Sequence, residues 1–288
     1  MDLQTLNQKE TPSVHEALFQ CCGSTRWVNQ LISFFPFASE LDLVKKATDI
    51  WYNHCTEADY REAFTHHPKI GDVKSLREKF ASTQHLAGKE QAGVQTASTA
   101  TIERLAQANS EYEAKNGFIF IVCATGKSAD EMLRLLEERL QNTPEEELAI
   151  AMGEQHKITI IRLKKLLTEG DWSNLPVSQI TTHVLDTSIG KTGQNMSIRL
   201  QTFKNNQWQT LAQGVTNKDG RIGDLLPACR NLPPDHYRMV FDTGNYYKNL
   251  TIRTFYPSVD ISFTVFDDTH YHVPLLVNPF GYSTYRGS

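Results

Sequence analysis

The distribution of glutamate divides this chain into two parts with different secondary-structure preferences. Glu recurs through the first part of the 288 residues, up to Glu169, and is absent from the remainder. Because Glu favours helices and disfavours strands, the change indicates a helical unit followed by a β unit. Lys and Arg number 19 against 25 Asp and Glu in residues 1–172, and 10 against 8 in residues 173–288. The sequence therefore predicts two domains, 1–170 and 178–288, joined by a linker at 171–177 that is polar and bounded by Gly and Pro.

Helix-start signals recur in the first part. Three capping patterns stand out, Ser13 with Glu16, Ser128 with Glu131, and Thr143 with Pro144 and Glu146. Apolar residues keep a period of 3.6 through residues 41–51 and 132–140. These patterns predict an all-α bundle of about six to eight helices. The apolar, glycine-bounded segment 117–126 departs from the helical pattern, and we expect it to be a buried part of the core.

The second part has the pattern of short strands and tight turns. Apolar and polar residues alternate through residues 261–266, residues 237–241 form another strand-like run, and residues 217–220 form a turn signal. These patterns predict an all-β sandwich of about seven or eight short strands.

Composition excludes several classes of protein. The net charge of -4 gives no global positive field for nucleic acid or an anionic membrane. No apolar run is long enough to span a membrane, and the first residues lack a secretory pattern. The five Cys are an odd number without zinc-ligand spacing, which is typical of reduced thiols. We therefore expect a cytoplasmic protein that binds neither nucleic acid nor membrane.

Histidines are the main candidates for chemistry in the β unit. His183 lies in the first strand-like run, Arg221 follows a turn, and His270 and His272 are spaced to share one face of a strand. Taken alone, these residues allow three interpretations: surface or core groups without a chemical role, a zinc site, or hydrolysis in which a neutral imidazole takes a proton from water while Arg stabilises the developing anion.

Three segments, residues 180–188, 216–221 and 270–288, resemble the 5-hydroxyisourate hydrolase family, which is related to transthyretin. The ending Tyr-Arg-Gly-Ser is that family's signature. The resemblance implies a transthyretin-like sandwich that forms a homotetramer, with active sites at the dimer–dimer interface and with no metal or organic cofactor. It places His183, Arg221 and His272 in catalysis and Tyr285 and Ser288 at the substrate, and it leaves the role of His270 open. The alternative, a transthyretin-like ligand carrier, lacks this His and Arg set and this ending.

In the helical unit, the clearest single feature is His67, followed directly by Pro68. Proline disfavours helical backbone at the preceding residue, so His67 should project from a helix-to-loop junction. Such a histidine can stabilise a helix end or act in catalysis. Glu90 can equally be a solvated residue of a helix start or a functional carboxylate.

Five short motifs together resemble the decarboxylases of 2-oxo-4-hydroxy-4-carboxy-5-ureidoimidazoline (OHCU). They are residues 67–71, 90–93, 109–120, 126–128 and 161–163, within a match over about 10–168. The resemblance implies that His67 is the acid–base residue, Glu90 its carboxylate partner and Arg162 the anion clamp. It also places a group of residues at the substrate, namely Pro68, Ala87, Gln91, Phe120, Ile121, Val122, Cys123 and Ala124. One departure is Ala87, where the family usually has Ser.

The two resemblances are chemically connected, because the product of the hydrolase is the substrate of the decarboxylase. Together they imply a bifunctional enzyme that acts on 5-hydroxyisourate and OHCU, forms homo-oligomers through the β unit and has possible dimer contacts through the helical unit. One alternative is an active hydrolase attached to an inactive, structural helical unit. Another is a non-catalytic carrier of an aromatic ligand.

Overall fold

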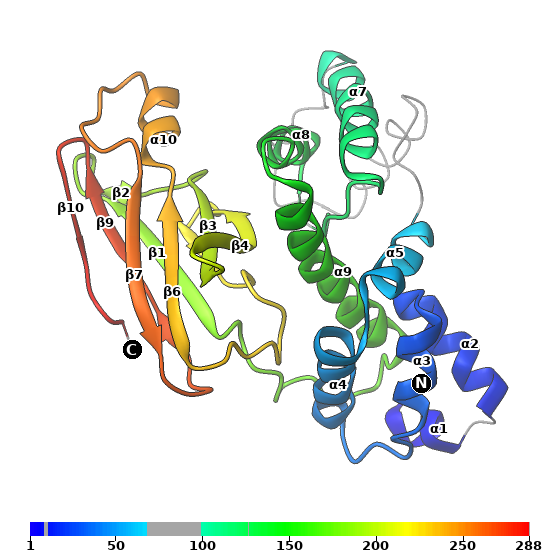
Figure 1. Ribbon diagram of the computed structural model, residues 1–288. Coiled ribbons are helices and arrows are strands. Elements are labelled where there is room, and N and C mark those ends of the chain that lie inside the picture. The colour runs from blue at the N-terminus through cyan, green and yellow to red at the C-terminus, as the bar shows by residue number, and fades with distance from the viewer. Residues whose placement is uncertain (9–10, 68–98, 126, 288) are drawn as a thin grey trace.

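The computed structural model describes residues 1–8, 11–67, 99–125 and 127–287. A group of helices and a two-layer β-sandwich lie beside each other in the molecule (Figure 1). The chain passes from one to the other through residues 167–179, all of which are described and none of which belongs to a helix or strand.

The first unit is entirely helical in its described residues, as the sequence predicts. Its elements are α1 (Leu3–Gln8), α2 (Thr11–Cys22), α3 (Thr25–Ile32), α4 (Glu40–Asp49), the π-helical turn η1 (Ile50–His54), α5 (Glu57–Thr65), α7 (Thr99–Asn116), α8 (Ala129–Arg139) and α9 (Pro144–Leu166). One buried apolar core joins these helices, and Trp27 and Trp51 are its largest fully buried side chains.

Two of the three predicted helix starts are confirmed. Ser128 and Thr143 each cap a helix with a reciprocal capping box, and Pro144 occupies the first turn of α9. The third prediction, a start at Ser13, is wrong because α2 already begins at Thr11. Proline is compatible with the first turn of a helix, so α2 can begin before Pro12 and not only after Ser13.

The second unit is a β-sandwich with one short helix, α10 (Thr243–Asn249). Its strands are β1 (Ile180–Asp186), β2 (Lys191–Thr192), β3 (Ser197–Lys204), β4 (Gln207–Val215), β5 (Arg221–Ile222), β6 (Asp235–Phe241), β7 (Val259–Val265), β8 (Tyr271–His272), β9 (Leu275–Asn278) and β10 (Gly281–Thr284). One sheet has the order β10-β9-β1-β2, with β5 and β8 also paired to β1, and the other has the order β4-β3-β6-β7.

The sandwich contains more strands than the seven or eight predicted. Three of them, β2, β5 and β8, have two residues each and all pair with β1. Two residues are too few to show an alternating pattern, so these strands cannot be predicted from their own residues and are defined by their pairing with β1.

Strand β1 has two different faces. Ile180, Thr182, Val184 and Asp186 are buried against the sandwich core, whereas the residues between them are only half-buried. Thr181 and His183 therefore lie on the outer face of the sheet. His183 pairs with Arg221 of β5, and Thr181 pairs with His272 of β8.

The segment before α8 is buried without being a strand. Phe118, Phe120, Ile121 and Cys123 are each at most 7% exposed, yet residues 117–125 are not assigned to any helix or strand. This confirms the expected buried core segment. Because its backbone is buried outside any helix or sheet, its backbone N–H and C=O groups need other hydrogen-bond partners.

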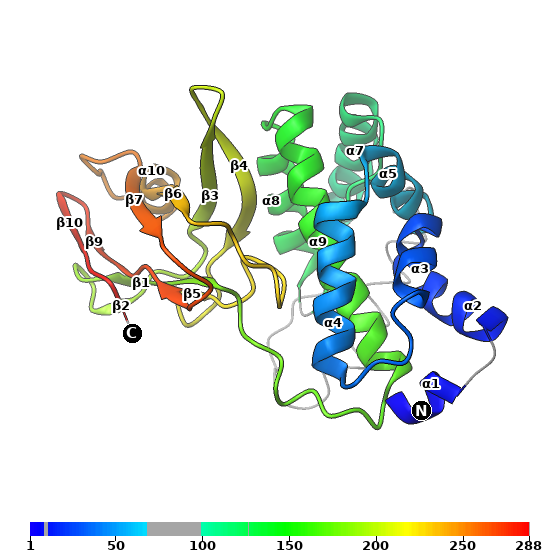
Figure 2. The ribbon, with the colours of Figure 1, turned by 60° about the horizontal axis from the view of Figure 1, so that its bottom comes forward.

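The two units contact each other along α8 and α9 on one side and β3 and β4 on the other (Figures 1 and 2). Gln213 accepts a hydrogen bond from Asn142 at 3.0 Å and donates to Glu138 at 3.3 Å. Glu138 also accepts from Ser197 at 2.8 Å. A cation–π contact adds to this interface, with the guanidinium carbon of Arg230 3.7 Å from the ring centroid of Tyr52.

Candidate active sites

One candidate site lies on the outer face of the sheet that contains β1. Arg221, His270, His272 and Tyr285 line one open cavity there. His183 does not line this cavity, but it stands opposite Arg221 in the pairing of β1 with β5. Side chains directly opposite each other on paired strands share a face, so His183 lies beside the cavity.

A single hydroxyl group connects two of the imidazoles. Thr181 Oγ1 lies 2.9 Å from His272 Nδ1 and 2.8 Å from His270 Nε2. A hydroxyl has one proton to donate, so the two rings do not both accept from it. If Thr181 donates to His270, His272 Nδ1 carries a proton, and the lone pair of His272 lies on Nε2. Thr181 was missed in the sequence, where it is only the outward-facing residue two positions before His183.

Two histidines at this site are held in the neutral form. Burial and the nearby Arg221 charge lower the pKa of His183. The same two causes lower the pKa of His272, and His270 and His183 contribute further. Neutral imidazole is the form that accepts a proton from water, so this environment suits a general base at neutral pH.

The last described residues pack directly onto this site. Gly287 donates a backbone hydrogen bond to the His272 carbonyl at 3.0 Å. A Cβ atom at Gly287 would lie 2.4 Å from Cδ2 of the His272 ring, so only glycine fits here without displacing the imidazole. Tyr285 is exposed at the rim of the cavity, and Ser288 lies outside the described residues.

The described part of the chain contains no group of three His, Cys, Asp or Glu side chains arranged to hold a metal ion. The zinc interpretation of His183, His270 and His272 therefore has no ligand set among these residues.

The second candidate site surrounds His67, which follows α5 and its C-cap residue His66. His67 Nε2 lies 2.5 Å from Oε1 of Gln155 on α9. The Gln155 side chain is fully buried, and its amide nitrogen donates to the Cys22 carbonyl at 3.0 Å.

The end of α2 brings the side chains of this site together. The last four carbonyls of a helix lack partners within the helix. The Phe19 carbonyl accepts from Gly23 N, and the Cys22 carbonyl accepts from Gln155. The carbonyls of Gln20 and Cys21 each accept from Arg162 at 3.4 Å. Arg162, the residue that the resemblance assigns to anion binding, therefore lies at the same helix end as the partner of His67.

Side chains supply several hydrogen bonds to the backbone of segment 117–125. Arg139 donates to the Ile121 carbonyl at 2.7 Å. Glu154 accepts from Cys123 N at 2.7 Å, and Lys127 donates to the Cys123 carbonyl at 2.8 Å. The pKa of Glu154 is below its usual range. Burial by itself would raise this pKa, but the Lys157 ammonium and the hydrogen bond from Cys123 N outweigh that effect. The segment is therefore fixed in shape without being part of a sheet.

Several residues predicted for this site lie outside the described residues, namely Pro68, Ala87, Glu90 and Gln91. Within the predicted segment, Phe120, Ile121 and Cys123 are buried, and Val122 and Ala124 are half-buried. Sequence reasoning missed Gln155, Arg139 and Glu154. The available signal was the run of polar residues 154–156 in the middle of α9, all of them buried.

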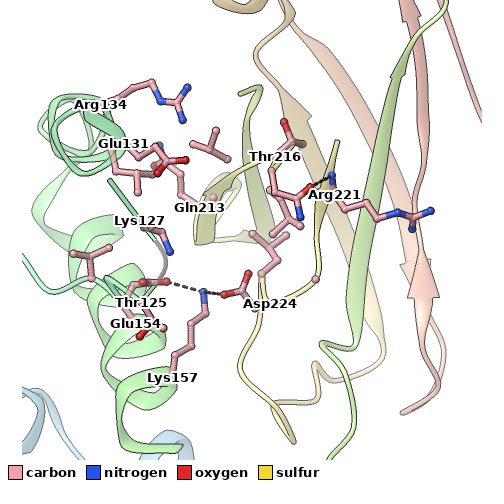
Figure 3. Close-up of a pocket in the computed structure, with 18 of the residues that line it drawn as sticks. Thr125, Lys127, Glu131, Arg134, Glu154, Lys157, Gln213, Thr216, Arg221 and Asp224 are labelled. Carbon is pink, nitrogen blue, oxygen red and sulfur yellow. Dashed lines mark hydrogen bonds and ion pairs between the residues drawn. The ribbon is translucent and has the colours of Figure 1, made fainter. Parts of the chain in front are cut away.

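A further cavity of about 230 Å³ lies between the two units (Figure 3). Lys127, Arg134 and Lys157 line it from the helical side, and Asp224 lines it from the sandwich. Lys157 lies 2.7 Å from Glu154 and 3.9 Å from Asp224. The side chain of Arg221 points away from this cavity (Figure 3). Strand β5 therefore separates this cavity from the site that contains His270 and His272.

Comparisons with known proteins match both units. The family model described as OHCU decarboxylase matches residues 7–164, and the model described as HIUase/Transthyretin family matches residues 180–287. The uric acid degradation bifunctional protein TTL of Arabidopsis thaliana is 34% identical, over 93% of this chain and 96% of that protein. The 5-hydroxyisourate hydrolase of Mus musculus is 42% identical, over 38% of this chain and 96% of that protein. A crystal structure of (S)-allantoin synthase covers all of both chains at 26% identity, with a TM-score of 0.46.

Proposed function

Because the chain belongs to the OHCU decarboxylase family through residues 7–164 and continues into a HIUase/transthyretin unit at residues 180–287, we propose that it catalyses two consecutive reactions. The sandwich hydrolyses 5-hydroxyisourate to OHCU, and the helical unit decarboxylates OHCU to (S)-allantoin. The observation that carries this proposal is the match to a bifunctional uric acid degradation protein over 93% of this chain. The first unit then comprises residues 1–170, the linker 171–177 and the second unit 178–288.

Hydrolysis requires a base, an anion stabiliser and a positioned water molecule. Neutral His272, oriented by Thr181, takes a proton from water, and the resulting hydroxide adds to the ring acyl carbon. Arg221 stabilises the oxyanion that forms. The ring C–N bond then breaks as the protonated His272 returns a proton to the departing nitrogen, leaving a carboxyl group on one carbon and a ureido group on the other. His183, opposite Arg221, supports this step, and Tyr285 and Ser288 enclose the substrate.

Decarboxylation needs an acceptor for the electron pair that remains when CO2 leaves. The imine of OHCU supplies that acceptor within the substrate. Arg162 holds the carboxylate end of the substrate, and the fixed segment Phe120–Ala124 lines the ring. His67, with Glu90 as its carboxylate partner, then transfers the proton to one face of the product. Protonation from one side yields a single enantiomer.

Two further features belong to this proposal. The sandwich assembles into a homotetramer, which the exposed aromatic side chains of Phe280, Tyr282 and Tyr285 support. The chain works in the cytosol, a location that its five unpaired cysteines support. No described helix is long and apolar enough to cross a membrane.

The test adds freshly generated 5-hydroxyisourate to the purified chain and follows ultraviolet absorbance and circular dichroism together. Rapid loss of substrate with a growing (S)-allantoin signal is the expected result. Fast hydrolysis followed by slow racemic decay would instead show that the helical unit, with Ala87 in place of Ser, is not a working decarboxylase. Ligand binding without turnover would indicate a carrier and reject both activities.

A further inference from the structure

One described partner of His67 is an uncharged side chain buried in the middle of α9. Gln155 is 0% exposed and comes from a helix 88 residues further along the chain. Burying an amide is unfavourable unless its donors and its acceptor find partners. Each contact of Gln155 therefore bears on how it is oriented.

The surroundings of Gln155 determine which end of the amide faces His67. Its nitrogen lies 3.0 Å from the Cys22 carbonyl, which only accepts hydrogen bonds, and 3.4 Å from Thr159 Oγ1. The amide nitrogen must therefore face α2, and the amide oxygen faces the imidazole. The oxygen only accepts hydrogen bonds, so His67 Nε2 at 2.5 Å carries the proton.

We infer that Gln155 is a positioning residue for the decarboxylation, which fixes the ring orientation of His67 and its Nε2–H tautomer while α2 holds Gln155 in place. The inference rests on the proposed function. In this arrangement Nε2 is occupied by Gln155, so the proposed proton exchange, with Glu90 as carboxylate partner, takes place at Nδ1. Gln155 itself does not touch the reacting atoms.

The first experiment replaces Gln155 in the full chain. Gln155→Leu removes both the acceptor for His67 and the donor to Cys22, and kcat of decarboxylation should fall about 10- to 100-fold with little change in KM. The hydrolase activity of the same molecule reports whether the chain is folded. Gln107→Leu is the matched control, because Gln107 is exposed on α7 and contacts only Glu111 among its described hydrogen-bond partners.

Gln155→Glu distinguishes positioning from a structural role. A carboxylate beside an imidazole favours the protonated ring, so the limb of the decarboxylation pH profile that reports His67 should move to higher pH. A Gln155→Leu variant with normal kcat would overturn the inference. So would a Gln155→Leu variant in which both activities fall together and the Gln155→Glu profile keeps its shape, because that outcome shows general unfolding.

A spectroscopic measurement separates this inference from the proposed function. The ¹⁵N chemical shifts of the His67 ring report which nitrogen carries the proton, whether or not the enzyme turns over. We expect the Nε2–H tautomer in the unmodified chain and a mixture of tautomers in Gln155→Leu. The same mixture in both proteins would overturn the positioning role. A chain that shows the expected tautomers but does not decarboxylate would instead reject the proposed activity.

Discussion

Among the described residues, an uncharged polar side chain contacts each of the two principal histidines. Gln155 contacts His67, and Thr181 contacts His272. A neutral partner orients an imidazole without adding the negative charge that would favour its protonated form. Gln155 and Thr181 therefore orient the two rings without adding a negative charge of their own.

The two sites should be separable by single substitutions. His67→Asn should reduce decarboxylation by at least about 100-fold and leave hydrolysis unchanged, because it removes the proton donor of one unit only. His272→Asn should do the reverse. Both are measured in the full chain with 5-hydroxyisourate and with separately prepared OHCU. Loss of both activities in either variant would contradict the two-site model.

The pH dependence of hydrolysis should depend on Arg221. The charge of Arg221 contributes to the lowered pKa of His183 and of His272. Hydrolysis should therefore lose half of its rate only at a pH below the ordinary histidine value of 6.5. Arg221→Gln removes that charge, so both pKa values should rise and the acidic limb of kcat/KM should move to higher pH.

Arg221→Gln should also lower kcat by about 100-fold, because the oxyanion loses its stabilising charge. An acidic limb that stays in place would show that neither histidine is the base.

At the scale of elements, the C-terminal end of α2 organises the helical site. Gly23 ends this helix with a φ of 81°, a conformation that favours glycine. A Cβ atom there would lie 3.0 Å from Cβ of His66, the residue before His67. The helix end and the residues that lead to the proposed catalytic histidine are therefore packed as closely as a glycine allows.

Gly23→Ala should reduce decarboxylation several-fold and destabilise the chain by about 1 kcal/mol or more. Gly190→Ala is the matched control, because Gly190 has a φ of 64° but open space where its Cβ would be. Gly190→Ala should lower the stability of the chain through backbone strain and leave the rate of decarboxylation unchanged. Activity assays and thermal unfolding of both variants provide the comparison, and equal decarboxylation rates would argue against the close-packing explanation.

Elements with a recognisable pattern in their own residues could be predicted from the sequence. Elements that depend on partners distant in the sequence could not. The capping boxes at Ser128 and Thr143 and the alternation in β7 are local patterns, and the structure contains them. Strand β5 is different, because its two residues become a strand only through β1, 38 residues earlier. Gln155 shows the same limit at the candidate site, since its role depends on Cys22 and His67, which are distant in sequence.

At the scale of the whole molecule, the interface between the units contains a half-buried acid, Glu138. Burial raises the pKa of Glu138, although Ser197 and Gln213 donate hydrogen bonds to it. A carboxyl group with a raised pKa in the folded state binds its proton more readily there than in the unfolded chain. It therefore lowers stability as the pH rises above the ordinary value of 4.5.

Glu138→Gln should relieve this cost, because an amide keeps an acceptor for Ser197 without a charge. We expect the Tm at pH 8 to rise by about 1–3 °C, and the gain to be smaller at pH 5, because a larger fraction of the carboxyl group is protonated there. Thermal scans at both pH values measure the difference. A Tm that falls equally at both values would show that the ionised form is needed at the interface.

The pairing of β1 also has a consequence for the order in which the molecule is made. During synthesis β1 is the first strand of the sandwich to emerge, and its parallel partners β8 and β9 follow about 90 residues later. Until they arrive, one edge of a strand with an alternating buried pattern stays open to other chains. Nascent or truncated chains that stop before residue 271 should therefore aggregate through β1, and hydrolase activity should be among the last properties gained during folding.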